Sequence, residues 1–339
     1  MGSDIEHVLP GKVEQFPVAA HNCFSGSLQR LALLLGREVE EPAIMEAGDG
    51  YLLQAGLDER FSPELVFGVE SVVLSGLTGL GYETRALVID PDGWREQLRD
   101  LLAEHAGVVV WVNSAHLDYA DVYSSHPGFM HAVLILEQSG DLRRVKVFDS
   151  LVDDRDRYSC VAWMTDGAFE GAILDRIRSK SLDHMGRFHT LLPAHTPPAD
   201  SRQIASAGLL RQARAFRENP CYFDAVQEYG RLCGKALAGE ADMAKHAARR
   251  LFDHVNVLYV IPGLRLLEWS LRRAEAPEYV ADLCRSLAGQ WRILGLQSLK
   301  FEATSSTAIA ARMDERFEGL SKATDHLWNV LLMEMGSGK

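Results

Sequence analysis

Three residues that can act together in covalent catalysis stand far apart in the sequence: Cys23, His131 and Asp149. Cys23 precedes a long stretch of helical periodicity and is predicted to lie at a helix N-terminus. There the helix macrodipole favours a thiolate, and backbone N–H groups can stabilise an oxyanion. In such a site the thiolate attacks a carbonyl carbon, the histidine accepts and returns a proton, and the carboxylate orients the histidine. The alternative for Cys23 is a small buried hydrophobic side chain.

A predicted hairpin brings the other two residues together. His131 opens the strand-like segment HAVLILE, and Asp149 closes the segment RRVKVFD, with the turn-rich tetrapeptide QSGD between them. If the hairpin is centred on Gly140, His131 lies directly opposite Asp149, and both side chains point to one face. A one-residue change of register would place them on opposite faces. The alternatives are a strand-end histidine with its own hydrogen bonds and a carboxylate that caps a turn.

Helical and strand-like patterns alternate from residue 13 to about residue 160 and must position these side chains. After Cys23 an apolar stripe follows one helix face as far as Gly36, formed by Leu28, Leu31, Ala32 and Leu35. The run VVVWVN, residues 108–113, is continuously apolar and predicts a central strand. A further helix is expected after Ser62-Pro63, ending at Gly81.

The proline-rich stretch LLPAHTPPADS, residues 191–201, predicts a domain boundary. Residues 203–339 carry several amphipathic stretches and almost no strand signal, which is typical of a bundle of about five helices. We therefore expect an α+β domain over residues 1–190, followed by an all-helical C-terminal domain over residues 202–339.

Composition excludes several classes of protein. The chain has 339 residues, of which 47% are hydrophobic, so it can form a packed core. Its net charge of −12 opposes a phosphate-tracking role in nucleic-acid binding. No apolar run approaches the ~20 residues that span a bilayer, and the N-terminus lacks the layout of a secretory signal. Five widely spaced cysteines indicate reduced thiols in a cytoplasmic protein, without a disulfide framework or a metal site.

Three segments of the first domain resemble the N-terminal domain of the butirosin biosynthesis protein H family: HNCFSGSLQRLALLLG, EPAIMEAGDGYLLQAG and VVVWVNSAHLDYADVYSSHPGFMHAVLILEQSGDLRRVKVFDS. That family is similar to papain-fold cysteine peptidases and is implicated in acyl transfer from a carrier-protein thioester to an amine. The resemblance covers about residues 15–155. It implies a papain-like cysteine peptidase/acyltransferase fold in which Cys23 is the nucleophile, His131 the base and Asp149 the residue that orients it. The sequence departs from the family where Asn22 separates His21 from Cys23.

Five further residues are candidates for the oxyanion hole or for substrate contacts: Gln15, Asn22, Ser25, His126 and Tyr119. Papain-like enzymes have a glutamine upstream of the nucleophile, and Gln15 precedes Cys23 by eight residues. Asn22 competes for that role, and a surface position is the alternative for Gln15. His126 is expected to line the cleft, and Tyr119 to shape an acceptor pocket.

The function that we expect is acyl transfer in specialised-metabolite biosynthesis. Cys23 would take an acyl group from the phosphopantetheine arm of an acyl carrier protein or peptidyl carrier domain and pass it to a small amine, with no bound cofactor. A thioesterase or an amidase/peptidase with the same triad is the first alternative, and a non-catalytic scaffold protein is the second. The helical domain is expected to form a carrier or acceptor site or a homodimer interface. Its arginines either contact an acidic carrier or form a solvated face; they are Arg211, Arg214 and Arg217 and the doublets Arg249-Arg250 and Arg272-Arg273.

Overall fold

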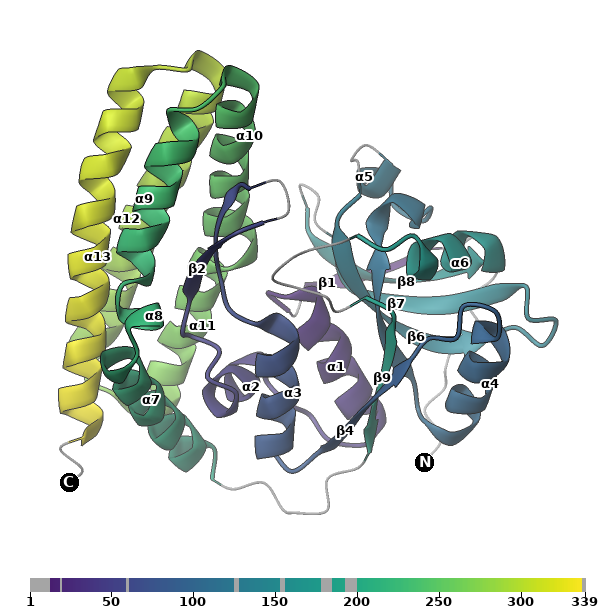
Figure 1. Cartoon of the computed structure of the whole chain (residues 1–339). Helices are drawn as coiled ribbons and strands as arrows, with labels where there is room; N and C mark the ends of the chain where they lie inside the picture. The colour runs from purple at the N-terminus through teal and green to yellow at the C-terminus, as the bar shows by residue number, and fades with distance from the viewer. Residues whose placement is uncertain are drawn as a thin grey trace. The chain divides into compact units, whose positions relative to one another are not determined.

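The chain forms two compact units (Figure 1). The computed structural model describes residues 13–18, 20–58, 61–124, 128–152, 156–177, 185–192 and 200–336. Among these, the first unit takes residues 13–41, 82–177 and 185–192, and the second takes residues 42–81 and 200–336. None of the helices in the described part of the chain has an apolar stretch long enough to span a membrane.

A seven-stranded antiparallel sheet forms the centre of the first unit, with its strands in the order β1-β8-β7-β6-β5-β9-β4. The strands are β1 (Glu14–Pro17), β4 (Glu83–Val88), β5 (Val108–Asn113), β6 (Met130–Gln138), β7 (Arg144–Val152), β8 (Tyr158–Thr165) and β9 (Arg187–Leu192). The helices are α1 (Cys23–Leu34), α4 (Trp94–Glu104), the 3₁₀ helix η1 (Ser114–His116), α5 (Asp121–Ser124) and α6 (Asp166–Leu174). The expected α+β class is therefore confirmed.

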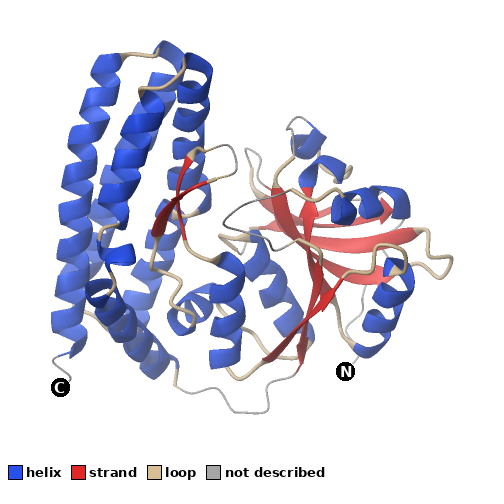
Figure 2. Ribbon diagram, viewed as in Figure 1, coloured by secondary structure: helices blue, strands red, loops and turns tan. Residues whose placement is uncertain are grey.

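Helices cover both faces of this sheet (Figure 2). Strand β5 is buried along its whole length, as its continuous apolar run predicts. Trp111 of β5 stacks on Phe24 of α1, with ring centroids 4.9 Å apart. Its neighbours Val110 and Val112 belong to a buried cluster that includes Trp94 of α4. Because successive residues of a strand point to opposite faces, α1 covers one face of the sheet, and α4 and α6 cover the other.

Helix α1 follows its predicted pattern closely. The side chains of Leu28, Leu31 and Ala32 are fully buried. The helix ends before Gly36, which has a φ of 85°, a left-handed conformation that glycine adopts without steric cost. At the other end, the Oδ1 atom of Asn22 accepts hydrogen bonds from the backbone N–H groups of Phe24 and Ser25.

The second unit is mainly helical. Its elements are α2 (Glu41–Ala47), β2 (Gln54–Leu57), β3 (Pro63–Val66), α3 (Val69–Gly79), α7 (Ser201–Glu218), α8 (Pro220–Phe223), α9 (Ala225–Leu237), α10 (Ala241–Phe252), the π-helix η2 (Asp253–Leu258), α11 (Val260–Arg273), α12 (Glu278–Thr304) and α13 (Thr307–Gly336). The helix expected directly after Ser62-Pro63 begins only at Val69, because Pro63 opens β3. Proline suits both the first turn of a helix and the first residue of a strand, so the local signal is ambiguous.

The unit boundaries differ from the predicted domains of residues 1–190 and 202–339, because residues 42–81 join the helical unit. Gln212 of α7 is completely buried, and its Nε2 atom donates to the carbonyl oxygen of Met45, at 3.1 Å. Its Oε1 atom accepts from the backbone N–H of Tyr51, at 2.9 Å. Gly208 lies so close to α2 that a Cβ atom there would be 2.4 Å from the carbonyl oxygen of Glu46. The periodicity of the local sequence does not predict these long-range contacts, so the sequence did not assign residues 42–81 to the helical unit.

Candidate active site

His131 and Asp149 form a buried pair on β6 and β7. The Nε2 atom of His131 is 2.9 Å from the Oδ1 atom of Asp149, and the two side chains are 5% and 0% exposed. The register differs from the expected one, since β6 and β7 pair Leu134 with Phe148 and Ile135 with Val147. Continued by one residue, this register places Asp149 across from Val133, two residues from His131. A shift of two residues keeps both side chains on one face, so they meet diagonally.

Two tyrosines complete the hydrogen bonding of Asp149. Its Oδ2 atom accepts from the hydroxyl of Tyr119, at 2.8 Å, and from that of Tyr123, at 2.5 Å. Its Oδ1 atom also accepts from the backbone N–H of Leu151, at 3.0 Å. The Tyr123 hydroxyl is in addition 3.2 Å from Nε2 of His131. The carboxylate is thus surrounded by hydrogen-bond donors. Because it binds the Nε2 atom of His131, Nδ1 is the ring nitrogen left to interact with a nucleophile.

This environment shifts the pKa values of His131, Asp149 and the two tyrosines. Burial lowers the pKa of His131, but the Asp149 carboxylate and the Cys23 side chain outweigh it, so that this pKa lies well above the ordinary histidine value. Burial raises the pKa of Asp149, but the interactions with His131 and Tyr123 outweigh it and lower this pKa overall. Burial and the neighbouring Asp149 charge raise the pKa of Tyr119 and of Tyr123 well above 10. The tyrosines therefore remain hydrogen-bond donors, and the pair favours imidazolium next to carboxylate.

Cys23 stands at the N-terminus of α1 and is partly buried. Its side chain interacts electrostatically with His131 and contributes to the raised pKa of that histidine. Its carbonyl oxygen accepts from the Ser150 hydroxyl, at 2.9 Å, which ties the start of α1 to β7. Cys23, the predicted nucleophile, is therefore adjacent to His131, the predicted base, and to Asp149, the predicted orienting carboxylate. Three other cysteines are buried, and burial raises the pKa of the Cys284 thiol to about 12 and raises the pKa values of Cys160 and Cys233 as well.

Glu41 positions the segment that leads to Cys23, and sequence reasoning missed it. Its side chain is 3% exposed and accepts from the backbone N–H groups of His21, at 2.7 Å, and Asn22, at 3.1 Å. The Ser25 hydroxyl donates to its Oε1 atom. Glu41 belongs to the acidic stretch EVEEP, in which nothing distinguishes the one buried glutamate from its exposed neighbours. Sequence reasoning placed Tyr123 in a loop that could shape an acceptor pocket, and only the structure shows that it donates to Asp149.

The remaining candidates have different environments. Ser25 is fully buried against Glu41, so it is not the substrate contact that was expected, because its hydroxyl is already engaged. The Oδ1 atom of Asn22 caps α1, which leaves only its amide nitrogen for an oxyanion. The Tyr119 hydroxyl donates to Asp149, and the role of Tyr119 in shaping an acceptor pocket stays a prediction. His126 lies outside the described residues.

Gln15 is exposed on the edge strand β1. It pairs with Cys160, which in turn pairs with Asp149, so the three residues form one row across the sheet. Strands are ~4.8 Å apart, which puts the backbone of Gln15 about 10 Å from that of Asp149. Gln15 therefore remains a candidate for the oxyanion hole.

Comparison with models of protein families finds no match for this chain. No curated protein matches it either. The interpretation of the site therefore depends on its geometry. Within the described ranges, no group of three His, Cys, Asp or Glu side chains is arranged to hold a metal ion.

The arginines that were candidates for carrier contacts are largely paired within the second unit. The Nε atom of Arg211 is 2.8 Å from Asp49, and Arg217 is 3.3 Å from Asp325. Arg249 is 3.5 Å from Asp253 on the same helical surface. These pairs favour the solvated helix face over a positively charged patch.

The shifted pKa values predict a histidine titration that nuclear magnetic resonance can follow. The stability that His131 contributes is fully present below its unfolded pKa of about 6.5 and is lost as pH rises through its raised folded value. The contribution of Asp149 is present above about 3.9 and is lost as pH falls through its lowered folded value. In ¹³C-histidine spectra we expect the His131 signal to titrate well above pH 6.5 and to move down in Asp149→Asn. A wild-type midpoint at or below 6.5 would contradict the charged pair.

Proposed function

We propose that this chain is a cysteine-nucleophile acyltransferase of specialised-metabolite biosynthesis. The observation that carries the proposal is the position of the partly buried Cys23 at the start of α1, beside the His131–Asp149 pair. The Ser150 hydroxyl, from the residue after Asp149, donates to the Cys23 carbonyl oxygen, and Nε2 of His131 is 2.9 Å from the fully buried Asp149 carboxylate. Thiol, imidazole and carboxylate in this order are what covalent acyl transfer needs. The papain-like fold and the membership of the butirosin biosynthesis protein H family belong to the same proposal.

The first half-reaction forms an acyl-enzyme. The Cys23 thiol gives its proton to Nδ1 of His131, and the thiolate attacks the carbonyl carbon of a carrier-bound thioester. The tetrahedral intermediate collapses when its bond to the carrier sulfur breaks, and His131 returns the proton to the leaving thiolate. Attacking and leaving groups are both sulfur, so the exchange does not have to expel a poor leaving group.

The second half-reaction releases the product. A small amine attacks the carbonyl carbon of the acyl-enzyme, its proton passes to His131, and the carbon–sulfur bond to Cys23 breaks to give an amide and the free enzyme. The imidazolium then returns a proton to the Cys23 thiolate. Asp149 stabilises the imidazolium in both steps. The acyl group arrives on the phosphopantetheine arm of an acyl carrier protein or peptidyl carrier domain, and all five cysteines are free thiols, which suits a cytoplasmic setting.

Intact-protein mass spectrometry tests this function. Brief exposure to a panel of acyl-pantetheine thioesters should add one acyl group to the wild type and none to Cys23→Ala. Cys221→Ala is the matched control, because Cys221 is exposed and stands outside the site. Loss of the adduct on adding amines, with an amide as product, indicates a transferase, whereas equal loss in water alone indicates the thioesterase alternative. If no thioester acylates Cys23, and iodoacetamide labels it no faster than Cys221, the proposal fails and a scaffold role leads.

A further inference from the structure

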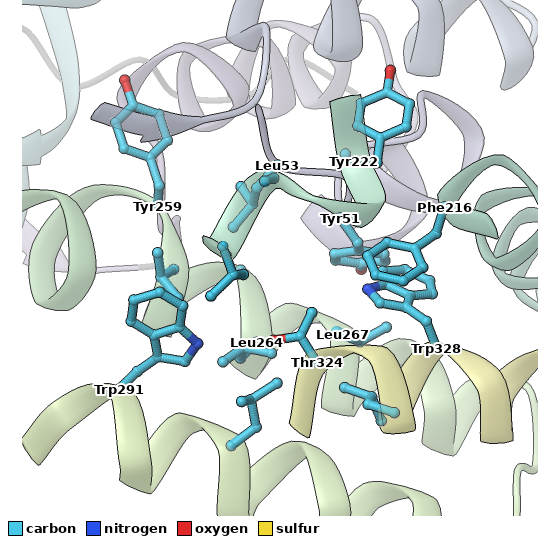
Figure 3. Close-up of a pocket in the computed structure, with 17 residues that line it drawn as sticks. Tyr51, Leu53, Phe216, Tyr222, Tyr259, Leu264, Leu267, Trp291, Thr324 and Trp328 are labelled. Carbon is cyan, nitrogen blue, oxygen red and sulfur yellow. The ribbon is translucent and has the colours of Figure 1, made fainter. Parts of the chain in front are cut away.

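The second unit contains a partly enclosed cavity of about 50 Å³ that the proposed reaction does not use. Figure 3 draws the 17 residues that line it. They come from the segment before β2 and from α7, α8, α9, α11, α12 and α13, together with Tyr259 between η2 and α11. The cavity therefore lies inside the helical unit, where side chains from distant parts of the sequence meet.

The wall of this cavity is apolar and uncharged. None of the 17 lining residues is acidic or basic, and they include Trp291 and Trp328, which are 2% and 4% exposed. Figure 3 shows the hydroxyl groups of Tyr222 and Tyr259 turned away from the space between the tryptophans, so these rings contribute carbon surface. A charged group inside would lose its hydration without gaining a partner, so the wall selects against ions.

Three polar groups interrupt the apolar wall. The Oγ1 atom of Thr324 is buried and has no hydrogen-bond partner among the described residues. In Figure 3 the indole nitrogens of Trp291 and Trp328 are turned toward the space between the two rings. An indole N–H only donates, and a buried hydroxyl without a partner costs free energy. A ligand that offers an acceptor oxygen would satisfy the Thr324 hydroxyl.

The helix backbone leaves room for a ligand at Gly263. The chain passes through the π-helix η2 into α11, and irregular helical turns of this kind are frequent at functional sites. Gly263 lines the cavity, and a Cβ atom built on it would meet nothing within 4 Å. Glycine weakens a helix interior relative to alanine, so Gly263 leaves this space open at a cost in helix stability.

We propose that this cavity binds a neutral carbonyl compound with a slender alkyl chain, whose oxygen accepts a hydrogen bond from Thr324. The size of the cavity favours a chain over a ring, because about 50 Å³ is well below the ~150 Å³ of an apolar cavity that holds benzene. The absence of charged lining residues favours a neutral amide, ester or ketone over a fatty acid or an alkylamine. This binding site is independent of the proposed reaction at Cys23.

Tryptophan fluorescence of the full chain tests the site, since Trp291 and Trp328 line it. The probes are primary amides from butanamide to decanamide, with octanoate and octylamine as charged counterparts. We expect a saturable change with the amides and an affinity that rises about fourfold per methylene until the cavity is filled. The charged probes should bind at least about tenfold more weakly.

Two glycine variants test whether the amides bind in the cavity or elsewhere in the unit. Gly263→Leu should fill the open space and abolish the fluorescence change. Gly289→Leu is the matched control, because Gly289 is an exposed helical glycine of α12 whose Cβ would also meet nothing within 4 Å, and it does not line the cavity. Thr324→Val should weaken amide binding about three- to tenfold. No saturable change with any amide, equal binding by the two leucine variants, or octanoate binding as tightly as octanamide would overturn the proposal.

Discussion

Replacing His131 by alanine is expected to slow the acylation of Cys23 about 10²–10⁴-fold. The reason is that His131 interacts with the Cys23 side chain and is held by Asp149, with 2.9 Å between Nε2 and Oδ1. Without the imidazole, the thiol loses the base that the proposed mechanism assigns to it. The rate is measured as the appearance of the acyl adduct by intact-protein mass spectrometry under single-turnover conditions.

The variant needs two controls. His116→Ala removes another histidine of the same unit that is paired with an aspartate, since its Nε2 atom is 2.9 Å from Asp175. This change should leave the rate unaltered. His131→Gln retains a side chain that can hydrogen-bond to Asp149, and circular dichroism checks that it is folded, so a slow rate in the folded variant is attributed to the lost base. Wild-type acylation in both His131 variants would remove His131 from the mechanism.

Replacing Glu41 by alanine is expected to lower the free energy of unfolding of the first unit by about 2–4 kcal/mol. Its buried carboxylate accepts from two backbone N–H groups, those of His21 and Asn22, and from the Ser25 hydroxyl. The substitution leaves all three donors without this acceptor in a site that water reaches poorly. Urea denaturation monitored by circular dichroism measures the change.

The same substitution should also reduce the reactivity of Cys23 by at least about tenfold under native conditions, because a displacement of ~1 Å can cost a hundredfold. Glu38→Ala is the matched control, since Glu38 lies in the same acidic stretch and is exposed. This control should change the free energy of unfolding by no more than about 0.5 kcal/mol and the reactivity of Cys23 by no more than about twofold. A Glu41→Ala protein as stable and as reactive as Glu38→Ala would show that the buried carboxylate does not position the nucleophile.

Local pattern predicted much of the first unit. The apolar stripe from Leu28 to Ala32 and the continuous run of β5 are one-dimensional signals, and both elements formed where they were expected. The prediction that His131 lies opposite Asp149 depended on the turn residues between the two strands. These residues predicted the hairpin correctly, but the predicted register differs from the observed one by two residues. The two side chains still meet, because side chains of a strand alternate between its faces with a period of two residues, and a shift of two residues leaves both on the same face.

What the sequence determined by itself was the set of chemical groups and the elements that carry them: a thiol before an amphipathic helix, and a histidine and a carboxylate on two strands of a hairpin. Only the tertiary structure showed that Tyr119 and Tyr123 donate to Asp149 and that Glu41 anchors the segment before Cys23. It also assigned residues 42–81 to the helical unit. Periodicity reports which face of an element is apolar, because that depends on neighbours within a few residues. The partner of a buried polar group is set by contacts between segments far apart in the chain, and these leave no periodic trace in the sequence.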